Sequence, residues 1–224
     1  DDPIIILREL DEPTFVEQSW VENYVLFSDH EDPTQVLARE IKARGWQHKT
    51  FAVETDSHYL PVWRHESIKS ALLEASFIDF SRILWEMRLL KSPQEVTYLK
   101  EAARIADTAL LAAIDTVGPG SGERDAAAAL YSTAIMEGAD NGRMALIASG
   151  NRSDSLHGTL GQHILKTGDI LHVESIPAYR GYSSRLMRST AIGAPPPPAV
   201  IATQDGKQKI LFIWNTSPKR CSSF

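Results

Sequence analysis

Residues 171–190 read LHVESIPAYRGYSSRLMRST. Two runs that suit β-strands flank a short turn-forming segment, which predicts a β-hairpin. Gly181 supplies the positive φ that a tight hairpin turn needs. With the turn centred on residues 179–180, Glu174 in the first strand lies opposite Arg185 in the second.

The predicted pair of Glu174 and Arg185 carries opposite charges on neighbouring strands. Cross-strand neighbours have Cβ atoms about 5 Å apart, so the two charges attract. An exposed pair contributes about 0–1 kcal/mol, whereas in a buried pair each charge needs the other, because an unpaired one is costly. Charge pairing alone indicates either a structural salt bridge or part of an active site.

The composition is that of an ordinary globular protein. The chain has 224 residues, 43% of them hydrophobic and 23% charged, with a net charge of −6. The negative charge gives no reason to expect a nucleic acid or an anionic membrane as partner. The single cysteine, Cys221, excludes an internal disulfide and predicts a reducing cytoplasm. No apolar run has the length of a membrane span.

The chain before the hairpin separates into two parts near residue 88. The first part alternates strands and helices, which predicts a small α/β layer. Asp32 and Pro33 start an amphipathic helix that Gly45 ends. The other elements expected here are strands at 3–10, 21–27, 49–55 and 76–84 and a helix at 65–75.

The second part begins with a long helix over 91–117. Ser92 is its N-cap, Pro93 its first residue, and Glu95 completes a capping box. A helix at 121–138 and strands at 144–150, 169–175 and 182–193 follow. Prolines 195–198 stop regular structure, and no clear periodicity follows them. The predicted units are therefore 1–88, 89–198 and an unrelated-looking tail, 199–224.

The loop SGNRSDSLHGTL, residues 149–160, presents His157 as a candidate for chemistry. Its side chain either transfers protons, since imidazole titrates near neutrality, or only hydrogen-bonds locally. Phosphate-binding glycine loops, zinc motifs, calcium loops and the GxSxG elbow are absent from the sequence. The remaining histidines lack ligand spacing, which favours surface or core positions: His30, His48, His58, His65, His163 and His172.

Four segments in order resemble the creatinase/prolidase/methionine aminopeptidase family, which has the pita-bread fold. They are LLKSPQEVTYLKEAARIADTAL, GPGSGERDAAAAL, ASGNRSDSLHG and KTGDILHVESIPAYRGYSSRLMRSTAIGAPP. DHEDPTQVLAREIKARGW and FAVETDSHYL resemble the amino-terminal domain of the prolidase-like and ectoine-hydrolase-like branch. The resemblance spans roughly residues 15–197.

This resemblance implies a fold class and a length. The expected architecture is a partial creatinase-type α/β amino-terminal domain followed by the α+β first half of a pita-bread catalytic domain. The family's catalytic domain is about twice the length of the matching part, and the chain starts DDPIIIL without Met. We therefore expect a truncated family member.

The resemblance also implies where metal ions would bind. Metal-dependent members hold two divalent ions through two aspartates on this hairpin, and these positions carry Glu174 and Arg185 here. A guanidinium has no lone pair to donate and stays protonated. At about 5 Å and an effective dielectric near 20, it repels each unit of ion charge by roughly 3 kcal/mol. The expectation is therefore that no cofactor is needed, with two divalent metal ions as the alternative.

The implied activity is hydrolysis of amide or amidino C–N bonds in small molecules. In the metal-independent, creatinase- or ectoine-hydrolase-like reading, His157 acts as general base and acid, and Glu174 or Arg185 holds the substrate. One alternative is a metal-dependent Xaa-Pro aminopeptidase or dipeptidase. Another is a catalytically inactive, truncated member that serves only in binding or dimerisation.

The same resemblance implies what the protein binds, where it is located and how it assembles. We expect a small molecule or short peptide as substrate, no nucleic acid, no membrane, a cytoplasmic location and a homodimer in the full-length form. Trp20 is the candidate that caps the partner's pocket, with core packing as its alternative, and Tyr182 is a candidate pocket-wall residue.

Overall fold

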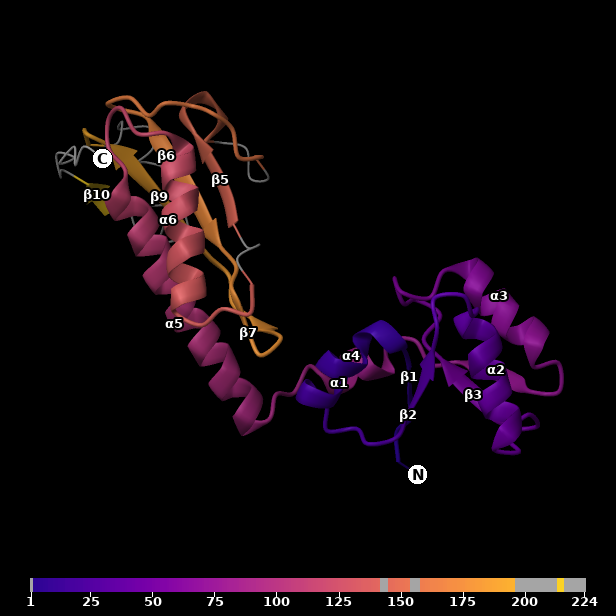
Figure 1. The fold of residues 1–224 in the computed structure, drawn as a ribbon. Coiled ribbons are helices and arrows are strands. Elements are labelled where there is room, and N and C mark those ends of the chain that lie inside the picture. Colours follow the sequence, from indigo (N-terminus) through magenta and orange to yellow (C-terminus); the bar gives the residue numbers. More distant parts are fainter. Residues whose placement is uncertain (1, 142–144, 154–157, 196–212, 216–224) are drawn as a thin grey trace. The chain divides into compact units, whose positions relative to one another are not determined.

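The structure, a computed structural model, describes residues 2–141, 145–153, 158–195 and 213–215. The chain forms two compact units, Asp1–Leu90 and Lys91–Phe224 (Figure 1). The sequence placed the first boundary after residue 88. None of the helices in the described residues has the length and apolar character that crossing a membrane requires.

Unit 1 contains two separate pairs of parallel strands. β1 (Ile5–Arg8) pairs with β2 (Tyr24–Phe27), and β3 (Thr50–Val53) pairs with β4 (Ser76–Asp79). Its helices are the 3-10 turn η1 (Glu9–Asp11), α1 (Glu12–Gln18), α2 (Pro33–Ala43), α3 (Val62–Ala71) and α4 (Ile83–Met87). The alternation of strands and helices is that of the predicted α/β layer.

Helix α2 begins as its sequence predicts. The Asp32 side chain accepts a hydrogen bond of 2.8 Å from the Thr34 backbone N–H, and Pro33 is the first helical residue. Ala38 and Ile41 then pack with Leu72 in the core of unit 1. The N-cap prediction is confirmed, because its residue types satisfy a helix terminus without help from tertiary contacts.

The strand predicted over 76–84 is wrong in its second half. Asp79 accepts hydrogen bonds from the Ser81 backbone N–H (3.0 Å) and from the Ser81 hydroxyl (2.5 Å), which bends the chain. Arg82 then takes a positive φ of 68°, and helix α4 follows instead of strand. Local side-chain-to-backbone bonding by Asp79 thus competes with the sheet.

Unit 2 packs two helices on one face of a four-stranded sheet (Figure 1). The helices are α5 (Pro93–Thr116) and α6 (Glu123–Met136). The strand order is β10 (Ile213–Asn215), β9 (Leu186–Ile192), β6 (Ile170–Ser175) and β5 (Ala145–Ser149). β6 runs antiparallel to both of its neighbours, whereas β10 is parallel to β9. The 3-10 turn η2 (Gly150–Arg152) follows β5.

The capping box predicted for the long helix is present at the start of α5. Ser92 Oγ accepts from the Glu95 backbone N–H at 3.3 Å, and Glu95 Oε2 accepts from the Ser92 backbone N–H at 2.6 Å. Two N–H groups that the helix leaves without partners are therefore satisfied by local sequence.

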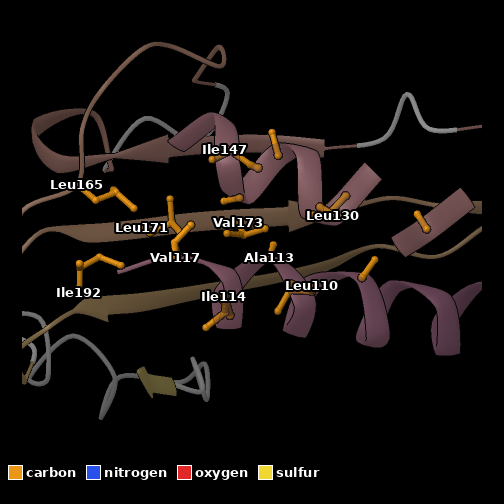
Figure 2. Packing of buried hydrophobic residues seen from close by; sticks show 14 of the residues in the cluster. Leu110, Ala113, Ile114, Val117, Leu130, Ile147, Leu165, Leu171, Val173 and Ile192 are labelled. Carbon is orange, nitrogen blue, oxygen red and sulfur yellow. The ribbon is translucent and has the colours of Figure 1, made fainter. Parts of the chain in front are cut away.

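The core of unit 2 lies between the sheet and the two helices. Leu171 and Val173 of β6 are fully buried there, against residues such as Leu110 and Ile114 of α5 (Figure 2). Side chains alternate along a strand, so the residue that follows each of them, His172 and Glu174, lies on the opposite face of the sheet. This second face carries the candidate site.

Candidate functional site

The predicted hairpin is present, but its turn lies one residue further along the chain. Short strands β7 (Ala178–Tyr179) and β8 (Tyr182–Ser183) are joined by Arg180 and Gly181, which have φ values of 50° and 77°. A two-residue turn of this kind needs positive φ at both central positions, and glycine suits the second. The turn therefore centres on Arg180–Gly181, and the sequence-based placement on 179–180 is wrong.

This shift changes the register of the hairpin. Glu174 lies directly opposite Met187, and not opposite Arg185. Residues 184 and 185 lie between β8 and β9, so the predicted strand 182–193 is interrupted there. Arg185 and Met187 are two residues apart, and a long side chain at such a diagonal position can still reach across the strand pair.

Glu174 and Arg185 do form an ion pair, between Glu174 Oε1 and Arg185 Nε. The Glu174 side chain is 0% exposed, whereas that of Arg185 is 53% exposed. Neither carboxylate oxygen of Glu174 accepts an aligned hydrogen bond within the part of the chain that the structure describes. The contact is therefore one of charge, and the buried carboxylate keeps unused capacity to accept hydrogen bonds.

His172 lies beside this pair on the same strand face. Its Nδ1 is 3.2 Å from the hydroxyl oxygen of Ser189 on β9. Burial lowers the pKa of His172 below its usual value, against the opposing effect of the Glu174 charge, which raises it. No local pattern in the sequence marks this histidine, because its neighbours on β5 and β9 are brought beside it only by strand pairing.

Tyr182 and Trp20 are placed on other parts of the molecule. The Tyr182 hydroxyl donates a hydrogen bond of 2.8 Å to Glu95 Oε1, which ties strand β8 to the start of α5. Trp20 lies in unit 1 and is 81% exposed, so the core-packing alternative is wrong for this side chain within its unit. Their roles in substrate binding, and the homodimer that Trp20 would serve, stay predictions.

His157 lies outside the described residues, since 154–157 are not among them. The described residues on either side are joined by a second polar cluster that the sequence did not reveal. The buried carboxylate of Glu123 accepts from Ser149 Oγ at 2.7 Å, from Arg152 Nη2 at 2.6 Å and from the Gly161 backbone N–H. Arg152 Nη1 also donates to the Thr159 carbonyl at 2.9 Å.

Gly161 is the sequence signal that could have revealed this cluster. A Cβ atom at this position would collide with the carboxylate of Glu123 and the guanidinium of Arg152. Only glycine lets the backbone approach the buried charges this closely. The Glu123 cluster, defined as Glu123, Ser149, Arg152 and Gly161, holds the start of α6 to the end of β5 and to the backbone at 159–161.

The residues at the hairpin do not fit a pair of divalent ions. Arg185 cannot donate a lone pair, and its charge already lies against the Glu174 carboxylate that a metal ion would need. Among the described residues, no group of three or more His, Cys, Asp or Glu side chains is arranged to hold a metal ion.

Two family models match the chain and together cover both units. Residues 97–211 match "Metallopeptidase family M24", and residues 1–90 match "Creatinase/Prolidase N-terminal domain". The first match continues past the proline run, beyond residue 197, where the sequence-based resemblance ended. The matches confirm the resemblance and the expected fold class, an α/β amino-terminal domain with part of a pita-bread domain.

Individual relatives agree with the family models. The chain is 30% identical over 148 residues to an Xaa-Pro dipeptidase of Pyrococcus horikoshii, covering 66% of this chain and 41% of the relative. It is 22% identical over 214 residues to the ectoine hydrolase of Halomonas elongata, covering 87% and 54%. An X-Pro aminopeptidase structure from Thermotoga maritima superposes with a TM-score of 0.75 at 23% identity, covering 92% and 56%. The chain thus spans about half the length of these relatives.

These comparisons correct the expectation that no cofactor is needed. The family that matches the catalytic part is one of metallopeptidases, so dependence on metal ions is its general property. The expectation rested on Arg185 alone, and a single side chain describes one position and not the whole ligand set. The ordered matches over both units show that the chain is a hydrolase-family protein and belongs to metallopeptidase family M24.

Proposed function

We propose that the protein hydrolyses the C–N bond of a small substrate that carries a carboxylate, such as a short peptide, and that Arg185 binds this carboxylate. The observation that carries the proposal is the asymmetry of the ion pair. Glu174 is completely buried, whereas half of the Arg185 side chain is exposed. The buried Glu174 carboxylate therefore fixes the guanidinium on one side, and the exposed part of the Arg185 side chain faces solvent.

Arginine suits this task because its planar guanidinium donates several hydrogen bonds in a fixed geometry that matches a carboxylate. Glu174 contacts Arg185 through Nε. The two Nη atoms of Arg185 make no hydrogen bond to the residues that the structure describes, and a guanidinium can donate through both to a carboxylate. A donor group that is held before the substrate arrives loses less conformational entropy on binding.

The relatives support a peptide-like substrate. The Pyrococcus horikoshii relative is an Xaa-Pro dipeptidase, and a dipeptide ends in a free carboxylate. In the proposed reaction, water attacks the carbonyl carbon, and a histidine takes a proton from the water and passes one to the leaving nitrogen. His157 is the residue proposed for this proton transfer.

A second candidate is a metal-dependent Xaa-Pro dipeptidase. The match to a metallopeptidase family and the Xaa-Pro dipeptidase relatives favour it. The divalent ions would then need ligands other than Arg185, whose guanidinium cannot coordinate them. A third reading, an inactive member that serves in binding or dimerisation, predicts no hydrolysis at all.

The test compares dipeptides with their C-terminal amides. Release of proline or prolinamide is measured for the purified chain acting on glycyl-proline and glycyl-prolinamide. The free acid is expected to be the better substrate, and Arg185→Gln is expected to raise its KM by about tenfold to a hundredfold, the effect of losing charge-assisted hydrogen bonds. Arg124→Gln, which removes an exposed arginine from α6, is the control for charge.

Each alternative predicts a different result in the same assay. Equal rates for the acid and the amide would overturn the proposed role of Arg185. Loss of activity with a chelator, and its return with Mn²⁺, would favour the metal-dependent dipeptidase. An intact circular dichroism spectrum with no hydrolysis of either compound would favour the non-catalytic reading.

A further inference from the structure

We propose that His172 is a second substrate-binding residue of the Glu174–Arg185 site, with Nε2 donating a hydrogen bond to the carbonyl oxygen of the scissile amide. This inference rests on the proposed function, because it assigns a further contact to the same substrate. It is carried by the placement of His172 on the sheet and by a polar atom left without a partner.

Strand pairing puts His172 and the ion pair on one face. His172 and Glu174 are two residues apart on β6, so both point away from the helices α5 and α6, and they are separated by about 7 Å along the strand. On the neighbouring strand, Ser189 lies opposite His172 and Met187 lies opposite Glu174. A small substrate whose carboxylate binds Arg185 therefore extends along the strand towards the imidazole.

The Nε2 atom of His172 is buried and finds no hydrogen-bond partner among the residues that the structure describes. Buried polar atoms in folded proteins are almost always hydrogen-bonded, and an exception calls for a specific reason. Glu174, two residues away, is also buried without an aligned hydrogen bond from those residues. Two neighbouring polar groups that are buried without a hydrogen-bond partner among these residues indicate a site that binds a polar ligand.

Ser189 is the hydrogen-bond partner of the other ring nitrogen, Nδ1. Its hydroxyl oxygen lies 3.2 Å from His172 Nδ1, and when the hydroxyl donates to this nitrogen, the ring proton is on Nε2. The neutral imidazole then presents an N–H group, which is the donor that a substrate carbonyl requires.

This contact also assists the reaction. When water attacks the amide, the carbonyl oxygen gains negative charge, and a fixed N–H donor stabilises that charge more strongly than it stabilises the substrate. His172 would therefore affect kcat as well as KM, whereas Arg185, which binds a distant and unchanging carboxylate, would affect mainly KM.

The experiment observes side-chain nitrogens in the ¹⁵N-labelled chain while glycyl-proline is added. The Arg185 Nε resonance and the His172 Nε2 resonance are both expected to shift with the same dissociation constant. His172→Phe, which keeps a ring but removes the donor, is expected to weaken binding about tenfold, as loss of one buried hydrogen bond implies. His172→Gln, which keeps a donor, is expected to recover part of this loss, and His48→Phe in unit 1 is the control.

The outcomes separate this inference from the proposed function. If Arg185 Nε shifts while His172 Nε2 does not, the role of His172 is overturned and that of Arg185 is supported. If neither resonance shifts at saturating glycyl-proline, both are overturned. Ser189→Ala supplies a further readout, because it is expected to change the ¹⁵N shifts of the His172 ring towards a mixture of tautomers, and unchanged shifts would contradict the part assigned to Ser189.

Discussion

Two glutamates of unit 2, Glu123 and Glu174, are both fully buried and both paired with an arginine, yet they differ in how completely they are satisfied. Glu123 accepts hydrogen bonds from Ser149, Arg152 and the Gly161 backbone. Glu174 has only its ion pair with Arg185 and no aligned hydrogen bond from the described residues. Their arginine partners are 36% and 53% exposed.

The difference separates a buried charge that supports the fold from one that belongs to the candidate site. A buried carboxylate that already accepts a full set of hydrogen bonds has no acceptor capacity for a ligand. It fixes the backbone segments that supply the donors. A buried carboxylate with one charged partner holds that partner in place while both keep unused bonding capacity. The same residue type at the same burial thus supports the fold at one position and a candidate site at the other.

Glu123→Gln is the substitution that we expect to destabilise the protein most. The amide group would turn an N–H₂ towards donors that now point at a carboxylate, so at least one buried hydrogen bond is lost and Arg152 loses its counter-charge. We expect unit 2 to lose about 3 kcal/mol of unfolding free energy. Urea titration followed by hydrogen–deuterium exchange of α6 and β5 amides measures this loss.

The matched control for Glu123 is Glu137→Gln at the other end of α6. Glu137 accepts from Arg104 at 2.5 Å, but both side chains are partly exposed. We expect this control to change the unfolding free energy by less than about 1 kcal/mol, as exposed ion pairs do. Equal effects at the two positions would show that donor saturation and burial do not distinguish Glu123.

A double-mutant cycle of Glu174→Gln and Arg185→Gln is expected to give a smaller effect. Arg185→Gln leaves a buried carboxylate without its counter-charge, whereas Glu174→Gln removes the buried charge and leaves Arg185 half in solvent. We expect a coupling free energy of about 1–2 kcal/mol, reduced by the exposure of Arg185, with Glu174→Gln the milder single substitution. A coupling near zero in chemical denaturation would mean that the ion pair does not hold Arg185.

Asp79 extends the comparison to an exposed carboxylate, whose substitution we expect to change stability least. Asp79 in unit 1 accepts from the Ser81 hydroxyl, the Ser81 backbone N–H and the Thr55 hydroxyl, and these hydrogen bonds lower its pKa to about 2. A depressed pKa stabilises the folded state above the ordinary value near 4, and the contribution disappears as the pH falls through about 2.

Asp79→Asn is therefore expected to be less stable than the parent at neutral pH and equally stable near pH 2. Tryptophan fluorescence during urea unfolding is a suitable measurement, because unit 1 contains Trp20, Trp46, Trp63 and Trp85. A difference between the two proteins that stays constant from pH 6 to pH 2 would contradict the assignment of these hydrogen bonds to ionised Asp79.

Much of the fold could be predicted because its signals are local. Asp32 and Ser92 cap their helices through side chains that act within three residues, so sequence alone identifies both helix starts. The hairpin was predictable from strand-forming runs around Gly181, but its turn was misplaced by one residue. The position of a turn depends on φ at two residues at once, and only the glycine was recognised.

The site was harder to predict because its contacts are distant in sequence. The pair of Glu174 and Arg185 was expected from direct opposition, yet it forms across a diagonal. The interaction between His172 and Ser189 and the cluster around Glu123 join residues 17 to 38 positions apart. No local pattern marks such pairs, since they exist only once strands have taken their register.

The helix caps, the alternation of apolar residues in the core strands of unit 2 and the charges at the hairpin can all be identified from the amino-acid sequence. Which of these charges are buried, and which of them accept a full set of hydrogen bonds, depends on the folded structure. A hydrogen bond within one helical turn needs only neighbouring residues, whereas burial and a full set of donors require segments that folding brings together.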